Sequence, residues 1–443
     1  MIAAVSSSWA LLLGMAFLMI GNGLQGSLLG VRASIEAFPT TVTGLLMSAF
    51  YFGFLAGSIL APRLVIRVGH VRVFGALASL ASTAILFHAL FVNPATWGVM
   101  RLISGLCYAG LYVVAESWLN EKATNETRGQ LLSIYMVITF SGMAFGQVLL
   151  NVGDPGRAGL FMLVSVLVSL AVIPILLSTT RGPAMEAPAP MGIREVYQAS
   201  PTGVVSALMN GILQGGVFSM GAVYGGLAEL TIPQISLFMI MLYIGGVCFQ
   251  WPIGRLSDRY DRRLVLAVVT FSAAIVAIFA NMVVGSFTAF LAMSFLFGGM
   301  MIPMYSLALA YANDHLQTEQ MVAASGTLVM VGGIGAFLGP TLLAASMDLF
   351  GTNGFFWAAA TVHALLGVFI LYRMTQRPAI PADEQGSYVA MSSRATMVAA
   401  EMYGEWATEE ESQSADDETP DEAAEDGNGP SVTSPAPAAP QVD

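Results

Sequence analysis

Long apolar stretches alternate with short polar segments along the first 373 residues of the chain. Each stretch holds about 20 residues, the length at which an α-helix crosses the hydrocarbon core of a bilayer. Gly and Ala recur at close spacing in most of them, which lets helices approach one another within a membrane. The pattern predicts an all-α membrane protein with twelve transmembrane helices, at residues 9–30, 42–62, 71–92, 96–118, 130–152, 158–179, 202–226, 234–254, 263–284, 286–310, 321–345 and 352–373.

A polar segment divides the twelve spans into two halves. Residues 180–201 contain four prolines and charges of both signs, as expected of a loop between two structural units. Several features recur at an offset of 188 to 193 residues, which indicates two pseudo-symmetric six-helix bundles. We therefore predict a bundle at 1–179, a central cytoplasmic loop at 180–201, a bundle at 202–373 and a cytoplasmic tail at 374–443.

Composition supports membrane insertion and separates the tail from the rest. The chain is 56% hydrophobic and 10% charged, whereas soluble domains carry roughly 25% charged residues. The net charge of -11 arises from the tail, because 15 of the 28 acidic residues lie from Asp383 onward. We expect the tail to be disordered, with a short amphipathic segment that touches the membrane as the alternative for Tyr388–Trp406. Cys107 and Cys248 lie in apolar stretches and predict neither a disulfide nor a metal site.

Basic residues predict the orientation in the membrane. With both termini in the cytoplasm, 14 Lys and Arg residues lie in cytoplasmic loops and only Arg32 and Arg157 lie outside, with Arg101 inside a span. This distribution satisfies the positive-inside rule. No cleavable signal peptide is expected, because the first apolar stretch lacks a basic flank and a cleavage site.

Gly254–Arg263 reads Gly-Arg-Leu-Ser-Asp-Arg-Tyr-Asp-Arg-Arg and concentrates charge between two spans. Its spacing resembles the loop motif of the major facilitator superfamily (MFS), which joins the second and third helices of each six-helix half. Asp261 stands where that motif has a second Gly. A degenerate copy lies 192 residues upstream at Pro62–Arg72, where Ile66 replaces the Asp. An ordinary charged turn between helices is the alternative.

A closer resemblance is to the bacterial YcaD-like branch of that superfamily. It rests on Val114-Ala-Glu116-Ser117, on Arg128-Gly129-x-Leu-Leu and on Gly146-Gln147-x-Leu, and it covers most of residues 1–373 but none of the tail. The resemblance implies a carrier that works by rocker-switch alternating access, with a substrate site between the two bundles.

The same resemblance implies a charged latch where the fourth helix of each half approaches the loop motif. Glu116 would pair with Arg67 or Arg72, and Asp314 with Arg262 or Arg263, unless these are ordinary charged helix ends. The residues expected to take part in gating are Arg67, Arg72, Glu116, Arg128, Gly254, Asp258, Arg259, Arg262, Arg263 and Asp314.

Polar residues inside the spans are candidates for the substrate cavity. Arg101 lies a few residues into the fourth span, where a charge needs a cavity, a partner or a route to the interface. Two amide pairs occur at equivalent depth in spans one and seven, and they either line the cavity or bond neighbouring helices. The candidate cavity residues are Asn22, Gln25, Arg101, Tyr108, Tyr112, Gln147, Asn210, Gln214 and Tyr305.

These features favour a secondary transporter of a small, polar organic molecule in a bacterial inner membrane. Lys122 is the only lysine and no phosphate-binding loop is present, so neither ATP nor any cofactor is expected. The spans contain no Asp/His or Ser/His cluster of the kind that would indicate an enzyme. No Asp or Glu lies at mid-membrane, so the sequence supports proton coupling only weakly.

The expected partners are the substrate, the lipid bilayer and, in a proton-coupled carrier, protons. We expect no nucleic acid and a monomer. Efflux of drug-like compounds is the alternative within transport, and a membrane sensor with a carrier's fold is the alternative outside it.

Overall fold

The computed structural model describes residues 2–123, 127–177 and 191–399, apart from 382–384, 387, 389, 392–395 and 397. Within these residues the chain is helical and contains no strand. The helices are α1 Ile2–Ile35, α2 Thr40–Val68, α3 His70–Leu90, α4 Pro94–Lys122, α5 Arg128–Leu149, α6 Gly159–Leu176, α7 Ile193–Ala199, α8 Pro201–Leu227, α9 Ile232–Ser257, α10 Arg262–Met282, α11 Phe287–Met301, α12 Met304–Asn313, α13 Thr318–Phe350 and α14 Gly354–Met374.

Twelve helical spans are long and apolar enough to cross a membrane, which confirms the predicted number. Two features were not predicted. The short helix α7 lies in the central loop, and the tenth span is broken into α11 and α12 at Ile302–Pro303. The break follows from Pro303, because proline has no backbone N–H and its ring clashes with the preceding turn.

Glycines set the closest helix contacts at equivalent places in the two bundles. A Cβ atom at Gly146 of α5 would lie 2.5 Å from the Ile20 carbonyl oxygen of α1. At Gly339 of α13, a Cβ atom would overlap the Ile212 carbonyl oxygen of α8. The close helix approach expected from the spacing of Gly and Ala is therefore confirmed at these positions, and the contacts follow the twofold repeat.

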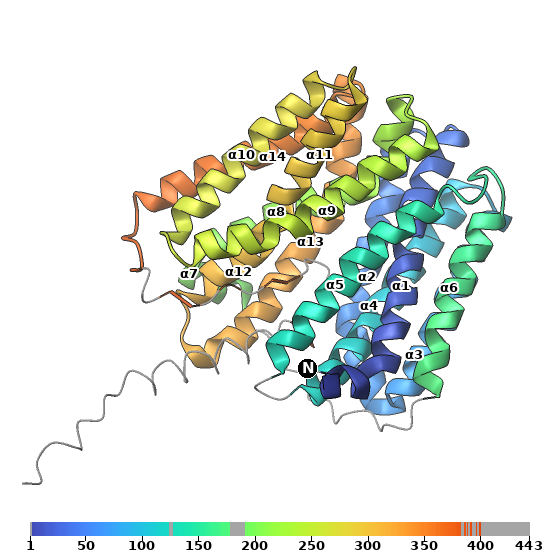
Figure 1. Ribbon diagram of the computed structural model, residues 1–443, viewed down its shortest axis with the longest axis horizontal. Coiled ribbons are helices and arrows are strands. Elements are labelled where there is room, and N and C mark those ends of the chain that lie inside the picture. The colour runs from blue at the N-terminus through green and yellow to red at the C-terminus, as the bar shows by residue number, and fades with distance from the viewer. Residues whose placement is uncertain are drawn as a thin grey trace, which may run out of the picture.

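The bundles α1–α6 and α8–α14 lie side by side and diverge toward the face where the N-terminus lies (Figure 1). We call this the Arg-rich face, because it carries the ends of α2 and α9 with Arg67, Arg255 and Arg259. At the opposite face the bundles touch directly. Asn151 Nδ2 donates to Ser236 Oγ at 3.0 Å, between α5 and α9.

The same face is closed by contacts of α2 with α13 and of α1 with α8. The Oγ atoms of Ser48 and Thr341 lie 2.9 Å apart. A Cβ atom at Gly30 of α1 would lie 3.0 Å from the Ala222 Cβ of α8.

Part of the tail up to residue 399 belongs to the described chain. Its described residues pack against the Arg-rich face, where Met391, Val398 and Ala399 are buried. Residues after 399, which hold most of the tail's acidic side chains, lie outside the described part of the chain.

Candidate functional site

A small cavity lies between the two bundles, lined by α1, α2 and α4 from one half and by α8 and α13 from the other. Its volume is about 30 Å³, and a cavity needs about 10–15 Å³ to hold one water molecule. The lining residues are Asn22, Phe50, Tyr51, Phe54, Leu55, Ser58, Ile59, Tyr112, Gly211, Gln214, Gly215, Val329, Met330, Gly333 and Ala336.

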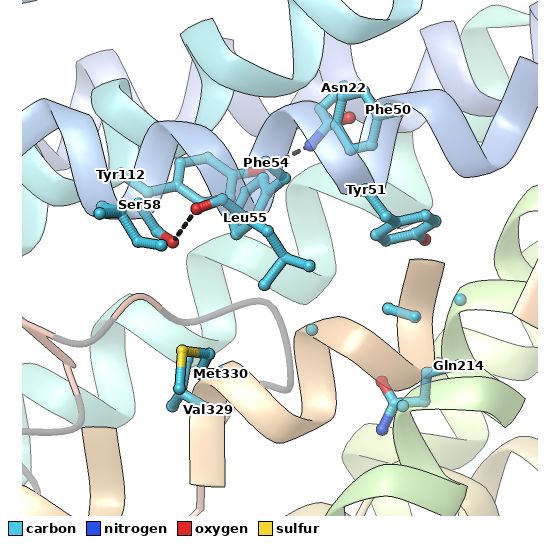
Figure 2. Close-up of a pocket in the computed structure, with 15 residues that line it drawn as sticks. Asn22, Phe50, Tyr51, Phe54, Leu55, Ser58, Tyr112, Gln214, Val329 and Met330 are labelled. Carbon is cyan, nitrogen blue, oxygen red and sulfur yellow. Dashed lines mark hydrogen bonds between the residues drawn. The ribbon is translucent and has the colours of Figure 1, made fainter. Parts of the chain in front are cut away.

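Polar atoms from both halves face this space. Asn22 Nδ2 donates to Tyr112 Oη at 2.6 Å, which joins α1 to α4. Figure 2 shows Tyr51 and Leu55 on one side of the cavity and Gln214 and Met330 on the other. The arrangement offers hydrogen-bonding groups at the edge of a mainly apolar space.

A second cavity, of about 20 Å³, shares Asn22, Phe50 and Tyr51 with the first. Arg101 lines it and is only 5% exposed. The guanidinium carbon of Arg101 lies 4.4 Å from the centre of the Phe50 ring, within the range of a cation–π contact. Arg101 therefore lies inside the protein beside the cavity and does not extend toward the lipid interface.

The two amide pairs have different surroundings despite their equivalent positions. Asn22 and Gln214 line the first cavity. Asn210 is fully buried and donates from Nδ2 to the Met301 carbonyl oxygen at 2.8 Å, at the break between α11 and α12. Gln214 Nε2 donates to Asn210 Oδ1 at 2.8 Å. Of the two alternatives for these amides, Asn22 and Gln214 line the cavity, whereas Asn210 forms a hydrogen bond to a neighbouring helix.

Four further predicted residues are buried. Gln147 lines the Arg101 cavity, accepts from Ser27 Oγ at 2.5 Å and donates to the Gly23 carbonyl at 2.8 Å. Gln25, Tyr108 and Tyr305 line neither of these two cavities.

The sequence interpretation missed most of the lining from α2 and α13. Tyr51, Phe54, Leu55 and Ser58 recur at spacings of three and four, which places them on one helix face. A largely apolar face with two hydroxyl groups is also typical of a buried core, so the spacing by itself does not separate the two roles.

At the Arg-rich face, Arg262 forms the centre of a buried charged cluster. Its Nη1 lies 2.6 and 2.7 Å from the two carboxylate oxygens of Asp314, and its Nε donates to Ser257 Oγ at 2.8 Å. The Arg262 and Asp314 side chains are 1% and 3% exposed. This is one of the expected pairs, and Asp258 adds a weaker contact at 3.4 Å.

Asp261, the departure from the loop motif, has a local role. Its Oδ1 accepts from the backbone N–H of Arg263 at 3.0 Å and thus caps α10. Its other oxygen lies 2.9 Å from the Arg263 guanidinium. Burial alone would raise the pKa of Asp261, but the hydrogen bonds from Arg263 hold that pKa below its usual value. Burial raises the pKa of the neighbouring Asp258.

The expected pairing of Glu116 with Arg67 or Arg72 is wrong for this conformation. Both arginines are exposed, whereas Glu116 is 1% exposed and accepts from Tyr135 Oη at 2.8 Å. The backbone N–H of Thr396 in the tail also donates to Glu116, at 3.1 Å. The long arginine side chains lie in solvent, where a lone ion pair stabilises little.

Three other predicted gating residues have simpler surroundings. Gly254 packs beneath the Tyr388 ring, which a Cβ atom would overlap. Arg259 is exposed. The side chain of Arg128 lies outside the described part of the chain.

Comparisons with known proteins agree with this architecture. The family model described as Major Facilitator Superfamily matches residues 11–231 and 199–400. The chain is 26% identical over 363 residues to the uncharacterized MFS-type transporter YcaD of Escherichia fergusonii, covering 82% of this chain and 94% of that protein. It is 27% identical over 376 residues to the uncharacterized MFS-type transporter Ent638_1421 of an Enterobacter species, with 83% and 96% covered.

Solved structures show the same fold at low sequence identity. A mutant of the nucleoside transporter NupG superposes with a TM-score of 0.72 at 13% identity, covering 83% of this chain and 99% of that chain. A D-xylose-proton symporter gives 0.64 at 13% identity, with 82% and 96% covered. The chain belongs to the major facilitator superfamily, within its YcaD-like branch, and is a membrane transporter and not an enzyme.

Proposed function

We propose that this transporter is a secondary carrier that binds a small organic molecule between its two bundles and exposes it to one face of the membrane at a time. The observation that carries the proposal is the cavity to which both bundles contribute, with Asn22 on one side and Gln214 on the other. Rocking one bundle against the other would expose such a site alternately to the two faces.

The lining favours a molecule with a flat or ring-shaped body and a polar edge. Phe50 and Phe54 offer aromatic surface, whereas Asn22, Tyr112 and Gln214 offer hydrogen bonds. Arg101 beside the cavity suits a group that accepts hydrogen bonds or carries negative charge. Similar folds carry a nucleoside and D-xylose, according to the names of those proteins.

Substrate-induced stabilisation tests this proposal without a transport assay. The purified protein would be heated with a library of metabolites and drugs at pH 5.5 and pH 7.5. A ligand at 100 times its Kd adds about 2.7 kcal/mol of apparent stability. We expect a polar ring compound to stabilise the wild type, and Asn22→Ala or Gln214→Ala to lose most of that effect. A ligand that stabilises both variants as strongly as the wild type would place the site elsewhere.

Efflux of drug-like compounds is the second candidate. It is favoured by the apolar part of the lining, formed by Leu55, Ile59, Val329 and Met330. Stabilisation by hydrophobic cations or dyes alone would support efflux over transport of a polar solute.

We further propose a bacterial inner membrane location, with the Arg-rich face and both termini in the cytoplasm. The positive-inside distribution supports this orientation. A monomer is proposed, because the cavity is complete within one chain.

A proton gradient is the proposed driving force, with the buried Glu116 as the group to test; stronger ligand stabilisation at pH 5.5 would favour this coupling.

A further inference from the structure

The tail crosses the Arg-rich face and contacts the second bundle at the charged cluster. Arg262 Nη2 donates to the Gly386 carbonyl at 2.5 Å, and the Gly386 N–H donates to Asp314 at 3.1 Å. The Tyr388 N–H donates to Asp258 at 2.9 Å. The tail thus binds through its backbone to the residues that the sequence assigned to gating.

The next contact of the tail is with α12. The N–H of Met391 donates to Ser306 Oγ at 2.8 Å, and that hydroxyl lies 3.1 Å from the Met391 carbonyl oxygen. The Met391 side chain is buried in an apolar cluster with Val204 and Ala324. Burial of an apolar side chain makes this contact stabilising as well as specific.

The tail then reaches the first bundle. Both the N–H and the hydroxyl of Thr396 donate to the buried Glu116 carboxylate. Val398 packs against Ala61 of α2 and Val113 of α4. Ala61 lies three residues beyond Ser58, which lines the central cavity, so Val398 packs on α2 about one helical turn from that cavity, toward the Arg-rich face.

We propose that the described tail residues Gly386, Tyr388, Met391, Thr396 and Val398 act as a plug that closes the transport pathway at the Arg-rich face, so that the carrier is inhibited by its own tail. The opposite face is closed by direct helix contacts such as Ser48 with Thr341. The docked tail joins the two bundles at the face where they diverge, through Ser306 of α12 and Glu116 of α4. Release of the tail would therefore be required before a substrate could enter from the Arg-rich face.

Thiol labelling tests the plug without knowledge of the substrate. In a background of Cys107→Ala and Cys248→Ala, Ser58→Cys places one thiol at the cavity. A membrane-impermeant maleimide would be added to the Arg-rich face. The maleimide reaches this thiol only in molecules whose tail is released, so the labelling rate is proportional to the fraction of such molecules. Gln130→Cys at the exposed start of α5 serves as the accessible control and should label equally in every variant.

Two pairs of tail variants are compared in this background. Thr396→Glu sets a second carboxylate against Glu116, while Ser412→Glu adds the same charge after the described tail. Truncation after Pro381 removes the plug, whereas truncation after Trp406 removes only the acidic end. We expect Thr396→Glu and the longer truncation to label about tenfold faster or more, and the two controls to label at the full-length rate.

Equal labelling in the full-length chain and after truncation at Pro381 would overturn the proposal. Thr396→Glu keeps the test decisive if the truncated chain does not fold, because it leaves the chain length unchanged. Either result leaves the proposed substrate site to its own test, since labelling requires no transport.

Discussion

Arg262 shows how a single residue combines stability with control. Its guanidinium is buried and bonded to Asp314, Ser257 and the Gly386 carbonyl. Desolvation of a buried pair offsets much of its mutual attraction, yet loss of one partner leaves an uncompensated buried charge. The position thus tolerates the loss of both charges better than the loss of one.

We expect Arg262→Ala to lower the free energy of unfolding in detergent by about 3–5 kcal/mol. The double variant Arg262→Met with Asp314→Leu should recover most of that loss, because no buried charge remains unpaired. Chemical unfolding followed by tryptophan fluorescence would measure both. Wild-type stability in the single variant would mean that Asp314 is solvated or neutral.

At the scale of the helix, α1 and α8 show how one repeated pattern takes two roles. Asn22 and Asn210 occupy equivalent places, and the sequence predicts the same surroundings for both. The break at Pro303 changes this, because it leaves the Met301 carbonyl oxygen to be bonded by Asn210. A buried carbonyl without a donor costs free energy, so Asn210 is held by the fold.

This difference predicts opposite outcomes for matched variants. Asn210→Ala should destabilise the protein by about 1–3 kcal/mol, since it leaves a buried acceptor unsatisfied. Asn22→Ala should change stability less and ligand binding more. Thermal unfolding with and without the ligand would separate the two effects. Equal loss of stability in both variants would contradict the assignment.

Helix spacing gives a second test at this scale. Gly339→Ala places a methyl group into the backbone of α8 at Ile212, whereas Gly75→Ala on α3 meets nothing within 4 Å. We expect the former to cost about 1–3 kcal/mol and the latter to be neutral or slightly stabilising. Similar stability of the two variants would show that α13 can move away from α8 at little cost.

Much of the whole molecule could be predicted from the sequence. Span length indicated the twelve helices, and the close spacing of Gly and Ala indicated that the helices approach one another closely. Burial by neighbouring helices could not be predicted, because it depends on how each helix is rotated about its axis. Tyr108 and Tyr305 were expected to line the cavity, but they line neither of the two cavities described above. Tyr51 and Phe54, which were not expected there, line the first cavity.

The tail shows the same limit more clearly. Its composition predicts disorder, because few apolar residues stand among many polar ones. The docking of its described residues depends on Met391, Val398 and Thr396, which meet sites on the two bundles. The amphipathic pattern of Tyr388–Trp406 covers these residues, but the sites they meet exist only once the bundles are assembled, so that pattern does not indicate them.

The most direct test of alternating access is a cross-link at the face opposite the tail. In the cysteine-free background, Ser48→Cys with Thr341→Cys would join α2 to α13, where the two hydroxyl oxygens lie 2.9 Å apart. Ser82→Cys with Ser165→Cys is the control, because those oxygens lie 2.7 Å apart within one bundle.

Transport of the ligand identified by stabilisation would be measured in proteoliposomes before and after oxidation, with the tail truncated after Pro381. If the bundles must separate at this face in each cycle, oxidation stops transport in the Ser48/Thr341 variant, reduction restores it, and the Ser82/Ser165 variant is unaffected. Undiminished transport by the fully cross-linked Ser48/Thr341 variant would contradict the rocking of the two bundles.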